Sequence, residues 1–464
     1  MGDGWSMGCA RSRLRVLLLL LSALSLLSRG LAAAPPEPVR NVVLVVSDDQ
    51  HWRDYGFMGH PVLRTPHLDR LARESLLFRR GYVPSSLCCP SLATLITGRF
   101  PHEHRIVGND PPGTDRLPRG SAEWRANFQA GREAMNRHLA EWPTLPTLLA
   151  PAGFRSLQTG KWWQGDFTRG GFTDGMTRGE RHGDDGLRIG RETMEPIRTF
   201  VGDRAARGEP FLVWYAPMLP HDPHDPPEAL VARYSKAVPS VHVARYLGNV
   251  ERFDASVGEL LRILDETGLA ESTLVVFVTD NGWIQDPAGP RYAAKSKRSP
   301  YDGGLRTPIM LRLPGRIEPG VCDTPVSSVD IVPTVLAACG VEAPMGLPGV
   351  DLLDAAAVAA RPAVFGECHT HTLVDLDDPA RGLLWRWAVA GRFKLVVPER
   401  LAADDPRLAV EGGALDADSR AWLASGTPRL FDLEADPDEN ESVAADHPDV
   451  VARLARAIDA WWTP

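Results

Sequence analysis

The chain has 464 residues, a formal net charge of −8 and 24% charged residues. This length is enough for one large core and a smaller appended unit. The acidic balance excludes a general affinity for nucleic acid or anionic membranes, although a local basic pocket can still hold an anionic substrate. Only five of the 51 basic residues are lysines, namely Lys161, Lys236, Lys295, Lys297 and Lys394.

The first 34 residues have the order of a secretory signal. Arg11, Arg13 and Arg15 precede an apolar run over residues 16–27, and small residues follow at 31–34. This order predicts a signal peptide over residues 1–34, with an uncleaved anchor as the alternative. Cleavage removes four arginines and one aspartate, so the formal net charge changes from −8 to −11. We therefore expect an exported protein in a periplasmic, secreted or lysosome-like compartment.

Strand-like and helix-like segments alternate over residues 35–355. The strand-like segments are residues 41–47, 211–216, 273–279 and 308–311. One helix-like segment starts with Thr65 as its cap. The others cover residues 144–152, 187–201, 241–267 and 327–339. This alternation predicts an α/β catalytic domain in which a mostly parallel sheet lies between helices.

A smaller unit is predicted after the alanine-rich stretch Leu352–Arg361, which we interpret as a linker. Shorter strand-like segments follow at residues 363–367, 384–390 and 393–398, and a last helix covers 448–462. This composition predicts a C-terminal subdomain over residues 356–464, with a small antiparallel sheet and one packed helix.

Two pairs of oxygen donors follow apolar strands. Asp48-Asp49 comes after residues 41–47, and Asp280-Asn281 comes after residues 273–279. The carboxyl ends of parallel strands are where ligands bind in open α/β sheets. Three carboxylates and an amide in one place repel unless a cation neutralises them, and oxygen donors favour Ca²⁺, with Mg²⁺ and Mn²⁺ less favoured. The structural alternative is a helix-capping pair and a turn.

Cys88 stands at the predicted start of a helix, in the sequence Cys88-Cys89-Pro90-Ser91-Leu92. The N–H groups of a first helical turn favour negative charge, which lowers the pKa of a thiol placed there. Cys88 is therefore a candidate reactive residue. We interpret Cys89 as a small buried residue rather than a second nucleophile.

The stretch Cys88–Arg99 resembles the sulfatase signature, C-x-P-S-R followed by Thr-Gly-Arg, with Leu92 where that family has arginine. Three later segments resemble sulfatase motifs in the family's order. They are Gly160–Gly165 (G-K-W-H-x-G, with Trp163 for histidine), Pro220–Pro223 (P-H-x-P) and Lys297–Pro308 (K-x-x-x-Y-E-G-G-x-R-x-P, with Asp302 for glutamate). The segment Leu430–Glu439 is similar to one in sulfatase C-terminal subdomains. The resemblance implies the alkaline-phosphatase-like fold of that family.

The resemblance also implies a mechanism and a set of site residues. Cys88 is the residue that a formylglycine-generating enzyme oxidises to formylglycine, which attacks sulfur. Lys161 holds the sulfate, His221 contacts it and protonates the leaving oxygen, and Lys297 faces the bridging oxygen. The implied metal ligands are Asp48, Asp49, Asp280, Asn281 and the modified Cys88.

Three functions remain open at this stage. The first is an exported sulfatase that hydrolyses a sulfate ester, on a carbohydrate or another sulfated small molecule. The second is a degenerate sulfatase-fold protein that binds sulfated glycans, because Leu92 and Trp163 replace residues that support the formylglycine hydroxyls in the family. The third is a phosphodiester or phosphonate ester hydrolase. We expect specificity to depend on three loops: Asn109–Asp115, Asp166–Arg178 and His369–Asp378. Trp162, Trp163, Trp385 and Trp387 are candidates for stacking on sugar rings, although a tryptophan is more often a core residue.

Overall fold

The structure, a computed structural model, describes Met1 and residues 37–464, so all of the predicted signal peptide except Met1 lies outside the described residues. A nine-stranded sheet in the order β4-β3-β5-β1-β6-β7-β2-β8, with β9 beside β2, runs through residues Val39–Pro464. The strands are β1 (Asn41–Ser47), β2 (Leu76–Tyr82), β3 (Arg155–Gly160), β4 (Asp174–Gly175), β5 (Phe211–Ala216), β6 (Thr273–Thr279), β7 (Arg306–Arg312), β8 (Gly320–Cys322) and β9 (Val326–Ser327).

The central strands of this sheet are parallel. β3 pairs with β5, β5 with β1, and β1 with β6, all in parallel, whereas β7 runs antiparallel to both β6 and β2. Each residue of β1 is buried, because both faces of the sheet are covered. The predicted α/β class with a mostly parallel sheet is confirmed.

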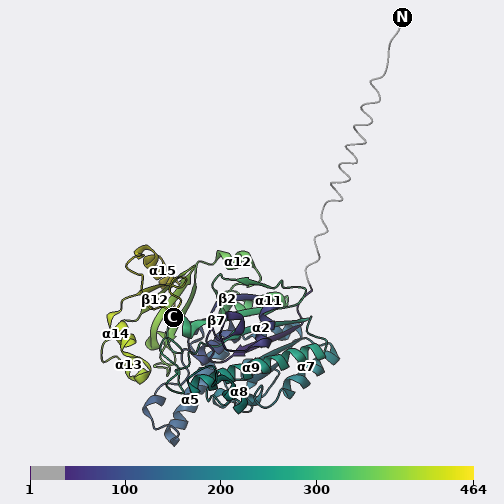
Figure 1. Cartoon of the computed structure of the whole chain (residues 1–464), viewed down its shortest axis with the longest axis horizontal. Helices are drawn as coiled ribbons and strands as arrows, with labels where there is room; N and C mark the ends of the chain where they lie inside the picture. The colour runs from purple at the N-terminus through teal and green to yellow at the C-terminus, as the bar shows by residue number, and fades with distance from the viewer. Residues whose placement is uncertain (2–36) are drawn as a thin grey trace. The chain divides into compact units, whose positions relative to one another are not determined.

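Helices cover both faces of the large sheet. On one face, Val42, Leu44 and Val46 share a core with α3 (Cys88–Thr97), α5 (Ala122–Ala140), α6 (Leu145–Leu149) and α11 (Ile331–Ala338). On the other face, Val43 and Val45 share a core with α2 (Pro66–Arg73), α7 (Glu195–Arg207) and α9 (Val241–Glu266). Figure 1 shows α7, α9 and α8 (Glu228–Tyr234) on one side of the strands and α11 on the other. The alternation of β1 side chains between faces explains this two-layer packing.

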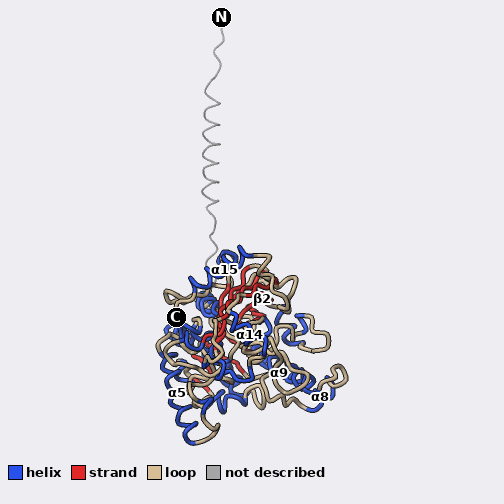
Figure 2. Tube along the Cα trace, turned by 90° about the vertical axis from the view of Figure 1, so that its left-hand side faces the viewer, coloured by secondary structure: helices blue, strands red, loops and turns tan. Residues whose placement is uncertain are grey.

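A second, four-stranded antiparallel sheet forms the C-terminal part, as predicted. Its strands, in spatial order, are β10 (Val364–His369), β11 (Leu383–Ala390), β12 (Phe393–Pro398) and β13 (Arg429–Asp432). Helix α15 (Pro448–Trp461) packs on it through Leu454 and Ile458. The remaining helices are α4 (Pro101–His104), α10 (Asp302–Leu305), α12 (Ala355–Ala360), α13 (Pro406–Glu411) and α14 (Ala417–Ser425). In Figure 2, which shows all the strands together, they lie in the interior of the folded chain and the helices lie around them.

The structure corrects three local predictions. The helix predicted over residues 187–201 begins only at Glu195, because Ile189 has extended backbone and Gly190 has a positive φ of 68°. Thr65 does not cap α2 with its side chain, since its hydroxyl bonds to Asp69 and to the Gly56 N–H instead. The predicted linker contains α12, whose Val358 joins the main core, and the boundary at residue 355 stays a prediction. In the described residues no helix combines the length and apolarity of a membrane span.

A buried cation joins the two sheets. Lys394 of β12 is fully buried, and its Nζ lies 2.9 Å from Asp302 Oδ1 and 2.9 Å from Glu439 Oε1. Replacing it by methionine (Lys394→Met) leaves Glu439 buried without a counter-charge and leaves Asp302 with Arg306 alone, 3.7 Å away. We expect a loss of about 3–5 kcal/mol in the free energy of unfolding, measured by urea denaturation. Lys236→Met, at an exposed lysine, is the matched control. A loss equal to that of the control would show that Lys394 does not hold the sheets together.

Candidate active site

Two pairs of polar residues lie side by side, each directly after one of two neighbouring strands. Ser47 of β1 lies opposite Thr279 of β6, so Asp48-Asp49 and Asp280-Asn281 emerge at the same sheet edge. The Asp49 N–H donates to Asp280 Oδ1 at 3.0 Å, and Asn281 Nδ2 donates to Asp49 Oδ1 at 2.6 Å. All four side chains are buried. The structure therefore brings together the four predicted oxygen donors.

The chemistry of these donors fits a hard divalent cation. One oxygen each of Asp48, Asp49 and Asp280 lies within 4.8 Å of the others. Asp48 Oδ2, Asp280 Oδ2 and Asn281 Oδ1 are buried and have no hydrogen-bond partner among the described residues. Burial, followed by repulsion from Asp48, raises the pKa of Asp280 well above its ordinary value. Unpartnered buried carboxylates are costly, and a cation bound by oxygen ligands removes that cost.

Cys88 faces this cluster from the first residue of α3. Its Sγ lies 3.1 Å from Lys297 Nζ, and it groups with Asp48 and His221 within 4.8 Å. Burial raises the pKa of the thiol, but attraction to Lys161 and Lys297 outweighs that effect and lowers the pKa to about 7. Burial raises the pKa of the adjacent Cys89. Of the two cysteines, Cys88 is the one whose thiol pKa is lowered, as expected of a reactive thiol.

Two buried lysines flank the acidic cluster. Lys161 Nζ lies 2.7 Å from Asp48 Oδ1, and Lys297 Nζ lies 2.7 Å from each carboxylate oxygen of Asp49. Lys161 follows Gly160, where a Cβ would stand 1.8 Å from a backbone oxygen, so only glycine lets β3 deliver this lysine. Lys295 instead binds backbone oxygens of Asp438 and Glu439. Of these two lysines, Lys297 is therefore the one that faces the acidic cluster.

His221 completes the cluster after β5. Its Nε2 lies 3.4 Å from Asp49 Oδ2, and its Nδ1 lies 2.8 Å from Asp222 Oδ1. Burial lowers the pKa of His221, but attraction to Asp48 and Asp49 outweighs that effect and raises the pKa to about 10. The ring is therefore placed and charged to donate a proton into the cavity.

These groups open into a cavity of about 450 Å³. Cys88, His221 and Lys297 line it, as do Asn109 and His371 from two of the predicted specificity loops. Sequence reasoning missed most of its other lining side chains, among them Arg181, His182, Arg291 and Tyr292. Residues 178–186 carry glycines and charges without any helical or strand period, so no local signal marks Arg181 and His182.

The tryptophans divide into core and cavity residues. Trp162, Trp385 and Trp387 are almost fully buried in hydrophobic clusters, so the hypothesis that they stack on sugar rings is wrong. Trp163 lines the cavity, and its ring lies between the guanidinium groups of Arg132 and Arg181, with Cζ-to-centroid distances of 5.1 and 4.8 Å. Trp163 is therefore held by two cations beside the cavity.

The arrangement is that of a metal-assisted hydrolase for an anionic ester: oxygen donors for a hard cation, a reactive residue beside them, and cationic groups facing the same cavity. The sequence matches the Sulfatase family over residues 40–341, and the chain belongs to this family. It is thus a sulfuric ester hydrolase by family, and its predicted membership is confirmed.

Among curated relatives, the chain is 28% identical to arylsulfatase A of Homo sapiens, over 93% of this chain and 89% of that protein. It is 29% identical to N-acetylgalactosamine-6-sulfatase of Mus musculus, over 80% and 76% of the two chains. Both relatives are named for the hydrolysis of sulfate esters, and the second is named for a sugar sulfate.

Solved structures share the fold. The Ps i-CgsB structure in complex with k-i-k-neocarrahexaose gives a TM-score of 0.68 at 20% identity, covering 92% of this chain and 93% of that one. Phosphonate monoester hydrolase SpPMH from Silicibacter pomeroyi gives 0.59 at 19% identity, covering 90% and 94%. At these identities the likeness establishes the architecture alone.

Proposed function

We propose that this chain is an exported sulfatase that hydrolyses a sulfate ester on a carbohydrate, using a formylglycine made from Cys88 and a bound divalent cation. One observation carries the proposal: Cys88 Sγ lies 3.1 Å from Lys297 Nζ, beside three buried carboxylates at two strand ends. The likeness to a sugar sulfatase supports the carbohydrate, and the predicted signal peptide supports export.

The cation that we propose is Ca²⁺, because all donors are oxygens and three are carboxylates. Asp48, Asp49, Asp280 and Asn281, with the side chain of residue 88, would hold it. Bound there, a divalent cation supplies positive charge that favours an anionic ester next to residue 88. A formylglycine-generating enzyme is the partner required to modify Cys88.

The chain's own residues bind the ester and move one proton. Lys161 and Lys297, both buried, offer N–H donors to sulfate oxygens and stabilise charge that develops there. His221 donates a proton to the leaving oxygen as its bond to sulfur breaks, and Asp222 holds the ring through Nδ1. Over the whole cycle, water is added across that bond, so the products are the free alcohol and sulfate.

Two other functions remain candidates, each with an observation in its favour. Leu92 packs in the hydrophobic core and Trp163 is held between two arginines, which favours a glycan-binding protein without turnover. The fold shared with a phosphonate monoester hydrolase favours the third function, in which the attacked atom is phosphorus rather than sulfur.

One panel of substrates separates the three. Purified protein from a host with a formylglycine-generating enzyme is assayed with 4-nitrophenyl sulfate, 4-nitrophenyl phosphate and 4-nitrophenyl phenylphosphonate. We expect kcat/KM for the sulfate ester to exceed both others by about 10²-fold or more. A preference for phosphonate would support the hydrolase alternative, and binding of a sulfated sugar without any released product would support the binding protein.

A further inference from the structure

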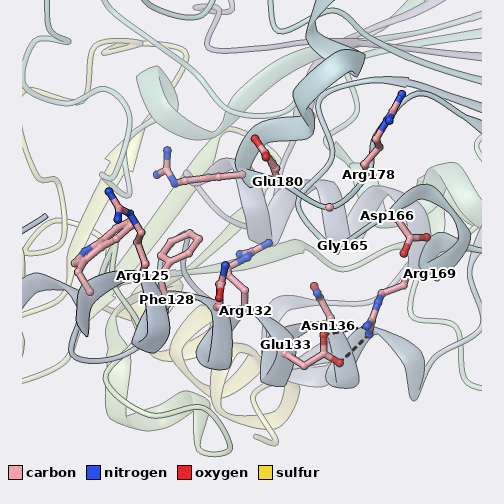
Figure 3. A pocket seen from close by; sticks show the side chains of 14 residues that line it. Arg125, Phe128, Arg132, Glu133, Asn136, Gly165, Asp166, Arg169, Arg178 and Glu180 are labelled. Atoms are coloured by element: carbon pink, nitrogen blue, oxygen red, sulfur yellow. Dashed lines mark hydrogen bonds and ion pairs between the residues drawn. The ribbon is translucent and has the colours of Figure 1, made fainter. Parts of the chain in front are cut away.

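A second cavity adjoins the active-site cavity. It has a volume of about 570 Å³, within the range of ligand sites, and lies between α5 and the segment 165–181. Figure 3 shows Arg132, Glu133 and Asn136 of α5 on one side of it and Arg178 and Glu180 on the other. Arg181 lines both cavities, so the two cavities are neighbours.

The lining of this second cavity is basic in an acidic protein. Five arginines and three carboxylates line it, whereas the chain as a whole carries a net charge of −8. Arg169 is neutralised by Glu133 (Figure 3). Arg125 and Arg132 form no ion pair with any carboxylate of residues 37–464. Two cations are thus available to an anionic ligand.

Of these two arginines, Arg132 is the one that we expect to contribute more to binding an anion. Its side chain belongs to a residue only 8% exposed, and its Nη2 has no hydrogen-bond partner in the described part of the chain. The other terminal nitrogen, Nη1, lies 3.3 Å from the Asn109 carbonyl oxygen and 3.5 Å from Cys89 Sγ. A buried guanidinium N–H without an acceptor is costly, and an anion with several oxygens is the ligand that guanidinium geometry suits.

Aromatic side chains beside the arginines indicate what carries the anion. Trp124 and Phe128, one turn apart on α5, both line the cavity. Their rings stack on each other, with the centroids 4.8 Å apart and an interplanar angle of 16°. The guanidinium groups of Arg132 and Arg181 both lie over the ring of Trp163, which lines the active-site cavity. Flat apolar faces next to cations suit a sugar ring that bears a sulfate group.

We propose that this second cavity binds a further sulfate group of the substrate, on the sugar next to the one whose ester lies in the active-site cavity. The substrate class is thus an oligosaccharide sulfated on at least two neighbouring units. This inference rests on the proposed sulfatase function and adds a binding site, built by Arg132 and Arg125, that discriminates multiply from singly sulfated chains.

The test measures binding by isothermal titration calorimetry at low ionic strength, in the Cys88→Ala background so that no ester is hydrolysed. The ligands are a tetrasaccharide sulfated on every unit and the same tetrasaccharide sulfated only on its terminal unit. The variants are Arg132→Gln and Arg125→Gln. The matched control is Arg137→Gln, at an exposed arginine of the same helix that does not line the cavity.

We expect Arg132→Gln to weaken binding of the fully sulfated ligand about tenfold or more, and the exposed Arg125→Gln about threefold. Arg137→Gln should have no effect, and none of the three should change binding of the singly sulfated ligand. The inference is overturned if Arg132→Gln binds the fully sulfated ligand as tightly as Arg137→Gln does. It is also overturned if Arg132→Gln weakens the binding of both ligands by the same factor. Because Arg125 is exposed, its variant decides the matter if Arg132→Gln does not fold.

A parallel assay keeps this inference separate from the proposed function. Protein with Cys88 intact is tested for hydrolysis of 4-nitrophenyl sulfate, which is too small to reach the second cavity. Failure to hydrolyse it contradicts the sulfatase proposal, whereas loss of the preference for the fully sulfated ligand contradicts only the second sulfate site.

Discussion

Replacing Cys88 by alanine should lower kcat for sulfate ester hydrolysis by about 10⁴-fold or more, measured as sulfate released from 4-nitrophenyl sulfate. The reason is that alanine has no side chain that can become the attacking group, while the residues proposed to bind the ester, Lys161, Lys297 and His221, are unchanged. KM should therefore change much less than kcat. Stability should be nearly unchanged, because the substitution removes one sulfur atom.

The adjacent cysteine provides the control. Cys89→Ser changes a buried thiol whose Sγ contacts Arg132 and Gln164, whereas Cys88 Sγ contacts Lys297. Burial raises the pKa of Cys89, which is the opposite of what a reactive thiol requires, so kcat should stay within about tenfold of the original. If Cys88→Ala keeps its activity, or if Cys89→Ser loses as much as Cys88→Ala, residue 88 is not the attacking residue.

Replacing Asp280 by asparagine should abolish binding of the proposed cation and lower kcat/KM by about 10³-fold. Asparagine keeps the oxygen that accepts hydrogen bonds from the Asp49 and Asn281 N–H groups, so the strand ends keep their geometry. What is lost is one negative charge at Oδ2, which accepts no hydrogen bond and lies 3.6 Å from Lys161 Nζ. Metal content by elemental mass spectrometry gives a readout that is independent of activity.

Asp203→Asn, at an exposed aspartate of α7, is the matched control and should retain both metal and activity. A chelator followed by Ca²⁺ should remove and then restore activity in the original protein, and should do neither in Asp280→Asn. An Asp280→Asn protein that contains metal in equal amount would contradict the proposed ligand set.

The sequence predicted the site best where chemistry follows a regular strand. Each of the strands over residues 41–47 and 273–279 is apolar and ends in an acid, and parallel neighbours align their carboxyl ends. These two local facts were sufficient to place Asp48-Asp49 beside Asp280-Asn281. The C-terminal sheet was also predicted, because its strands are short apolar runs between turns.

The remainder depends on contacts that no local pattern records. β3 has the polar sequence Arg-Ser-Leu-Gln-Thr-Gly, and it is buried only because it pairs with β5. β2 was missed because Arg79 and Arg80 interrupt its apolar residues. Arg132 and Arg181 are far apart in sequence and meet at Trp163 only in the folded chain. Sequence reasoning therefore finds the reactive centre and misses the arginine-rich cavity beside it.

The most direct test of the account is the mass of the peptide that contains residue 88, from active protein made with a formylglycine-generating enzyme. We predict the mass of formylglycine at this position, in a fraction that rises in proportion to the sulfate ester hydrolysis of the preparation. Full hydrolytic activity in protein whose residue 88 is entirely unmodified cysteine would contradict the proposed mechanism.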